Sequence, residues 1–142
     1  MSEYDPDHVP EKHYFLLGVK IIIVNSSNEV LLLRRSQKSS SADSWGFPGG
    51  GVDENEAPAL AAIREVQEET AVVIKDPKII TSILVDERGE PAVILGFYAR
   101  VDSPEVVLNW EHSEHKWVSI DELESLGLPD LHQQILHAYI AV

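Results

Sequence analysis

Three glutamates, Glu65, Glu68 and Glu69, lie close together in a segment that the sequence predicts to be helical. Because a helix advances by about 100° per residue, their side chains share an arc of about 100° on its surface. Like charges three or four residues apart repel one another, and the C-terminal end of a helix is already negative. Clustered carboxylate oxygens are ligands that suit Mg²⁺ or Mn²⁺. The pattern therefore predicts a divalent-cation site on this helix.

Three consecutive glycines at positions 49–51 precede that helix. Glycine allows the backbone to approach a ligand closely, so this segment is a candidate wall of the cation site. We expect the helix to begin between Asp53 and Ala57, since Pro58 suits a first turn. The residues that should form its buried face are Ala59, Ala62, Ile63, Val66 and Thr70. The acidic arc lies next to that face and should border a cleft.

The composition limits the classes of partner. The chain has 142 residues, 44% of them hydrophobic and 25% charged, which predicts one globular domain. Lys plus Arg total 11 against 24 Asp plus Glu, and the net charge of −13 argues against nucleic-acid or anionic-membrane partners. A small phosphate-bearing substrate is still compatible if metal ions and a few arginines reverse the local sign. The sequence contains no cysteine, which excludes disulfides and thiolate zinc sites.

The polar N-terminus carries no apolar targeting segment, and the apolar run at residues 19–24, interrupted by Lys20, is too short to span a bilayer. We therefore expect a cytoplasmic protein. Residues 1–12 should form a flexible arm and residues 13–142 one domain. The expected strands are residues 13–25, 29–35, 79–87, 91–101, 106–108 and 116–120. With a helix start capped by Ser119 and a helix over residues 131–141, the pattern predicts an α+β fold around a mixed sheet.

The longest motif consists of Gly50, five residues, Glu56, seven residues and then REVQEETAV at positions 64–72. It closely resembles the Nudix box, and FPGG at 47–50 with WVS at 117–119 is also similar to that family. The resemblance implies a Nudix α/β/α sandwich with a mixed β-sheet and a central catalytic helix. One position departs from it, because the box has glycine where this chain has Ala71. An alanine in a left-handed cap costs about 1 kcal/mol; alternatively, the helix ends differently here.

The family implies a Mg²⁺-dependent hydrolase, with Mn²⁺ as an alternative, that cleaves the diphosphate linkage of a nucleoside diphosphate joined to another moiety by water attack at phosphorus. The positions that match its metal ligands are the carboxylates of Glu65, Glu68 and Glu69 and the carbonyl of Gly49. Arg64 and Glu56 match a salt-bridged pair that holds the acidic side chains. Arg35 matches an arginine that contacts phosphate in some members.

Glu111 matches a glutamate that binds metal or acts as general base in some members. Diphosphate cleavage needs neutralised phosphate oxygens and a deprotonated water, and either Glu111 or Glu65 is suited to take that proton. Glu114, His112 and His115 are substitutes in the same segment. Trp110 is the best candidate for stacking on a base, and we assign it, Gly50 and Arg35 to substrate binding.

Two alternative functions use the same residues. A nucleotide-sugar hydrolase of the family attacks carbon with a histidine base, a role that is open to His112 or His115. A non-catalytic Nudix-like module would bind a nucleotide without cleaving it. In each case the partner is a small-molecule nucleotide. The sequence leaves open which nucleotide that is, and whether the chain is a monomer or a homodimer.

Overall fold

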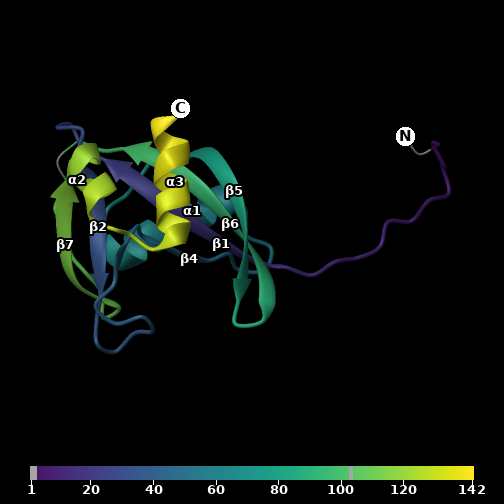
Figure 1. The fold of residues 1–142 in the computed structure, drawn as a ribbon, viewed down its shortest axis with the longest axis horizontal. Coiled ribbons are helices and arrows are strands. Elements are labelled where there is room, and N and C mark those ends of the chain that lie inside the picture. The colour runs from purple at the N-terminus through teal and green to yellow at the C-terminus, as the bar shows by residue number, and fades with distance from the viewer. Residues whose placement is uncertain (1–2, 103) are drawn as a thin grey trace.

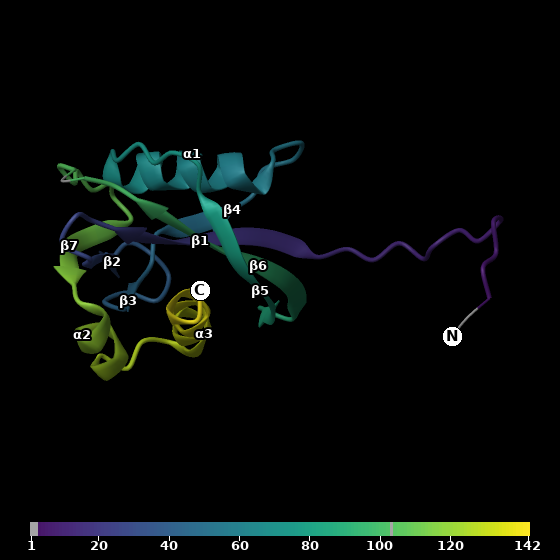
Figure 2. The same cartoon turned by 90° about the horizontal axis from the view of Figure 1, so that it is seen from above.

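A seven-stranded mixed sheet lies between one helix on one face and two helices on the other, as Figure 2 shows. The computed structural model describes residues 3–102 and 104–142. Its elements, labelled in Figure 1 except for β3, which Figure 2 labels, are β1 (Leu16–Val24), β2 (Val30–Arg35), β3 (Trp45–Gly46), β4 (Gly49–Gly51), α1 (Pro58–Thr70), β5 (Lys78–Glu87), β6 (Glu90–Arg100), β7 (His112–Val118), α2 (Ile120–Ser125) and α3 (Asp130–Ile140). The expected α/β/α sandwich with a mixed sheet is confirmed.

The sheet is built around β1. Its strand order is β3-β2-β1-β6-β5, with β4 paired to β1 and β7 paired to β2. β1 and β6 run parallel from the pair Leu16–Ala92 to the pair Val24–Arg100, whereas the other pairings are antiparallel. β4 pairs with β1 at Gly18, Val19 and Lys20. The glycine segment therefore lies beside the middle of the sheet.

The hydrophobic core has two halves because successive side chains of a strand point to opposite faces. Ile21 and Ile23 of β1 pack with Val66 of α1, and Ile22 packs with Ile135 of α3 on the other face. These side chains are all almost fully buried. The continuous apolar run of β1 thus follows from a strand that is covered on both faces.

α1 begins at Pro58, one residue beyond the expected window, with Ala57 as an extended N-cap. Ala62, Val66 and Thr70 of its predicted face are buried, and so is Ala61. The helix ends at Ala71, which adopts the left-handed conformation with φ 61° and donates its N–H to the Gln67 carbonyl. Of the two alternatives for Ala71, the chain adopts the left-handed cap.

Some boundaries differ from expectation. Residues 106–108 were expected to form a strand and do not; instead, the Val107 N–H donates to the Thr70 carbonyl at the end of α1 at 2.9 Å. β7 begins at His112, four residues earlier than predicted, because it pairs along β2 as far as Arg35. The predicted cap is present, since Ser119 Oγ accepts from the Glu122 N–H.

The predicted arm of residues 1–12 lies partly outside the described residues. From residue 3 to residue 15 the chain forms no helix or strand, and Figure 1 shows this segment running away from the sandwich. Within the described part of the chain, no helix is both long and apolar enough to cross a membrane.

Candidate functional site

The glycine strand β4 allows α1 to approach the sheet closely. A Cβ atom at Gly50 would lie 2.6 Å from the Glu65 carboxylate, and one at Gly49 would lie 2.0 Å from the Val19 carbonyl oxygen. It would also lie 2.9 Å from Cδ of Lys20. Any side chain at these two positions would therefore displace its neighbours. Gly50 makes room for a carboxylate on one side, and Gly49 makes room for a lysine.

Arg64 holds the acidic side chains of α1 together. Its guanidinium donates two hydrogen bonds to Glu56, at 2.8 and 2.9 Å, one to Glu65 at 3.0 Å, and longer ones to Glu68 at 3.3 Å. It also donates to the Gly51 carbonyl at 3.0 Å. The pairing lowers the pKa of Glu56 to about 2 and raises that of Arg64. The structure thus brings together the Arg64–Glu56 pair and two of the three predicted carboxylate ligands, Glu65 and Glu68.

Glu69 points inward and is only 1% exposed. Its Oε1 accepts the Gly49 N–H at 2.8 Å, and its Oε2 lies 3.5 Å from Nε2 of His112. Burial raises the pKa of Glu69 to about 8, against the opposing effects of the Gly49 N–H and of Lys20. Burial also lowers the pKa of His112 to about 4, with Arg35 and Lys20 adding to that shift. Both partners of this close pair are therefore favoured in their neutral forms.

The three helix glutamates are oxygen ligands that suit a divalent cation, but their carboxylates do not converge on one point. Among the described residues, no three Asp, Glu, His or Cys side chains lie close enough to hold a metal ion. The reason is that Arg64 bridges Glu65 and Glu68, while Glu69 is turned toward the Gly49 amide. Burial raises the pKa of Glu65, as it does for Glu69, so a cation would relieve a cost that both carboxylates carry. The donor set fits a hard divalent cation.

Of the candidates in the 111–115 segment, Glu111 is the carboxylate near the cluster. Its charge raises the pKa values of Glu65 and Glu69. Glu114 is paired with Arg34 at 2.8 Å, and His115 is exposed. Next to Glu111, Trp110 is 66% exposed, as a stacking platform requires.

Arg35 lies at the end of β2, where its Nε donates to the Ser40 carbonyl at 2.7 Å. It borders a small cavity of about 30 Å³ whose other lining residues include Lys20, Gly46, Phe47, His112 and His132. Reasoning from the sequence missed Lys20 and His132. A signal existed for Lys20, because it is the one charge within an apolar strand. His132 had no such signal, since its position in an amphipathic helix does not distinguish it.

His132 connects α3 to the glycine segment. Its Nδ1 accepts the Phe47 N–H at 3.1 Å, and its ring fills the space above Gly46, where a Cβ atom would lie 2.6 Å from Cε1. Burial lowers the pKa of His132 to about 3, with Lys20 adding to the effect. The ring is therefore neutral, and since Nδ1 is an acceptor, its proton is on Nε2.

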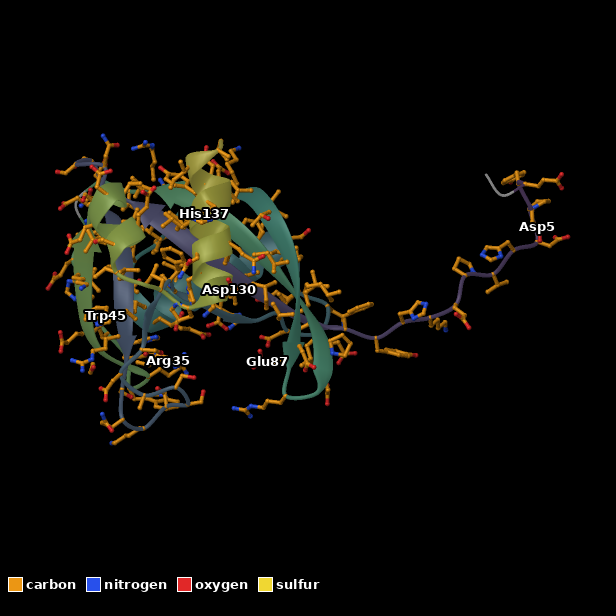
Figure 3. The ribbon with its side chains drawn as sticks, in the orientation of Figure 1. Asp5, Arg35, Trp45, Glu87, Asp130 and His137 are labelled. Atoms are coloured by element: carbon orange, nitrogen blue, oxygen red, sulfur yellow. The ribbon has the colours of Figure 1, made fainter. Side chains whose placement is uncertain are left out.

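A larger groove of about 740 Å³ lies beside the cluster. Its walls are mostly apolar and include Phe15, Leu16, Leu17, Ile94 and Leu131, and it reaches Lys20, Gly50 and Glu56. In Figure 3, Asp130 marks the lower end of α3, and Arg35 and Glu87 lie below it, to its left and to its right. Another groove, of about 680 Å³, lies near Ala71, Lys75 and Arg100 and includes none of the site residues.

Comparison with known proteins relates these features to one family. The NUDIX domain family model matches residues 15–139. An RNA pyrophosphohydrolase of Vibrio vulnificus (strain YJ016) is 40% identical over 68 residues, which are 48% of this chain and 37% of that protein. An 8-oxo-dGTP diphosphatase of Proteus vulgaris is 32% identical over 65 residues, which are 46% of this chain and 58% of that protein. The MutT protein from Methanosarcina mazei Go1 has a similar crystal structure, with a TM-score of 0.82 and 28% identity over 93% of this chain and 97% of that one.

Proposed function

The chain belongs to the NUDIX domain family, and on that premise we propose that it is a Mg²⁺-dependent hydrolase of small nucleotides. It cleaves the diphosphate linkage of a nucleoside diphosphate joined to another moiety, with water attacking phosphorus. The observation that carries this proposal is the placement of Glu65, Glu68 and Glu69 on α1 beside a strand made only of glycine. Arg64 bonds Glu65 and Glu68, while Glu65 lies against Gly50 and Glu69 accepts the Gly49 N–H. Mn²⁺ is the alternative cation.

The carboxylates of Glu65, Glu68 and Glu69 and the carbonyl of Gly49 would hold the cation. When bound, a divalent cation neutralises phosphate oxygens and lowers the pKa of bound water. Arg64 reduces the repulsion between Glu65 and Glu68 by bonding both, and its bond to the Gly51 carbonyl holds the pair beside β4. Glu111, whose charge acts on both Glu65 and Glu69, is the group we assign to take the proton of the attacking water.

The substrate in this proposal is a nucleotide and not the end of an RNA chain. The groove of about 740 Å³ has a volume in the range of small-molecule sites and has apolar walls on which a nucleoside can lie. Gly50 lines it, so a nucleoside there would have its phosphates near the Glu65 carboxylate of α1. The net charge of −13 disfavours a polyanion that extends beyond the site. Trp110, exposed beside Glu111, is a second surface for a base.

Release of phosphate or pyrophosphate from a panel of nucleoside triphosphates, dinucleoside polyphosphates and nucleotide sugars, with and without Mg²⁺, tests the proposal. We expect turnover that depends on the cation. Glu69→Gln should lower turnover by about 10²-fold or more, because it removes the negative charge of one of the proposed cation ligands. Glu124→Gln, the same change at an exposed position on α2, is the control. Tight nucleotide binding without turnover on any substrate would favour the non-catalytic alternative.

A further inference from the structure

Lys20 occupies an unusual position for a lysine. It lies in β1, between the buried Val19 and Ile21, and is paired with Gly49 of β4 on one side and Gly96 of β6 on the other. Its side chain runs along Gly49, where only the missing Cβ leaves space for it. A lysine within a sheet loses hydration, and this loss costs free energy unless the ammonium has a partner.

Among residues 3–102 and 104–142, Lys20 forms no ion pair and no hydrogen bond through its side chain. Glu69 is the carboxylate whose charge acts most strongly on Lys20. It does not pair with the lysine, because its Oε1 accepts the Gly49 N–H and its Oε2 lies beside His112. Two other cations of the sheet and helix are paired, namely Arg34 with Glu114 and Arg64 with Glu56. The ammonium of this half-buried lysine is thus without a counter-ion in contact.

Arg35 is a second cation on the same cavity. Its Nε bonds the Ser40 carbonyl, and within the described chain its guanidinium contacts no carboxylate. Burial lowers the pKa of Lys20, and the nearby charge of Arg35 adds to that shift, so the two cations repel each other. The histidines of the cavity, His112 and His132, add no charge, because burial keeps both neutral. Two adjacent cations that are not balanced by contact leave room for an anion.

Lys20 lines both the small cavity and the larger groove. It borders the cavity with Arg35 and the groove with Gly50, and we call its position, shared by the two, the junction. The glutamates of α1 approach this point from the other side of β4, since the Gly50 position faces Glu65 while Gly49 faces Lys20. A phosphate group at the junction would touch cations on one side and lie next to the carboxylates on the other.

We propose that Lys20 binds one phosphate group of the substrate at this junction, beside Arg35, which the resemblance to the family already assigns to phosphate. The inference rests on the proposed function, which it extends by assigning a substrate-binding residue within the sheet. A nucleoside in the groove would place its phosphates there, and the two cations would orient the group that water attacks. Lys20 is thereby a specificity residue for phosphorylated ligands and not only a charge balancing Glu69.

The test uses inorganic pyrophosphate as the probe, titrated calorimetrically into the full chain in the presence of Mg²⁺. Lys20→Met should weaken its binding by at least about tenfold, equivalent to 1.4 kcal/mol, through loss of a charge-assisted contact. Arg35→Met should have a similar effect, and the double variant should lose less than the sum of the two because both contact one group. Lys75→Met, which removes the same charge at the distant groove, should change affinity by less than about twofold.

Unchanged affinity in Lys20→Met, or no binding of pyrophosphate by the unaltered chain, would overturn the inference. If Lys20→Met does not fold, as its circular dichroism would show, Arg35→Met decides, because its side chain is only partly buried; full affinity in that variant would also overturn it. Nucleotide hydrolysis is measured on the same samples. Pyrophosphate binding that needs Lys20 in a chain without turnover refutes the proposed function alone, and turnover that does not respond to Lys20→Met refutes this inference alone.

Discussion

Replacing Glu69 by glutamine should change how the stability of the metal-free protein depends on pH. The side chain is 1% exposed, and its Oε1 accepts the Gly49 N–H. Glutamine retains an oxygen for that bond and removes the buried charge. The variant therefore isolates the free energy of ionising one carboxyl group inside the sandwich, with little change in packing.

The magnitude follows from the pKa of Glu69, which is raised from 4.5 to about 8 mainly by burial. Well below pH 4.5 the carboxyl group is protonated in both the folded and the unfolded chain, and its ionisation takes nothing from the free energy of unfolding. Between that value and about 8 the folded chain keeps a proton that the unfolded chain has lost. Each pH unit in this window lowers the free energy of unfolding by about 1.4 kcal/mol. From pH 5.5 to pH 7.5 the loss is about 2.5 kcal/mol, because the folded-state carboxyl group is already partly ionised at pH 7.5.

Urea unfolding in EDTA at several pH values measures this difference. The advantage of Glu69→Gln over the unaltered protein should grow by about 2 to 3 kcal/mol from pH 5.5 to pH 7.5. Ionisation of Glu65, whose pKa is also raised, is common to both proteins and largely cancels. Glu124→Gln at an exposed position should give a curve parallel to that of the unaltered protein. Parallel curves for Glu69→Gln as well would show that Glu69 ionises at its ordinary pKa, and the burial argument would fail.

Three further substitutions test the local geometry. Ala71→Gly should raise the free energy of unfolding by about 1 kcal/mol, since the residue adopts φ 61°; lower stability in urea would contradict the strain argument. Gly50→Ala should weaken Mn²⁺ binding, followed by the paramagnetic relaxation of water, because its Cβ would meet the Glu65 carboxylate; unchanged affinity would place that carboxylate elsewhere. Arg64→Met should destabilise the metal-free protein in EDTA by about 1 to 3 kcal/mol, because Glu56 loses its two hydrogen bonds; equal stability would mean that the network contributes nothing.

The sequence predicted the parts of the fold that have strong periodicity or an unambiguous motif. The strands β1, β2, β5 and β6 and the helices α1 and α3 all appear within a few residues of the expected bounds. The error at residues 106–108 has a physical cause. This segment has the apolar composition of a strand, but its Val107 N–H satisfies the last turn of α1 and does not join the sheet. Local composition does not contain that tertiary contact.

The acidic cluster could be predicted because its members lie within one helix, where the spacing determines which side chains are neighbours. The cationic side of the site could not, because Lys20, Arg35 and His132 come from three separate elements. Only the pairing of β1 with β4 and the packing of α3 against the β3–β4 connection bring them together. Lys20 carried a local signal, a single charge in an apolar strand, but that signal does not say what the charge faces.

The glycine strand β4 explains how opposite charges can work at one point without neutralising each other. Successive positions of a strand face opposite sides, so Gly49 faces Lys20 and Gly50 faces Glu65. A side chain at either position would push its neighbour away, with contacts of 2.9 Å to Lys20 and 2.6 Å to the Glu65 carboxylate. Direct ion pairing of Lys20 with the carboxylates would satisfy both charges and leave neither for a ligand. A thin backbone layer between them keeps the carboxylates available for a cation and the lysine available for a phosphate, within the short distance that a diphosphate spans.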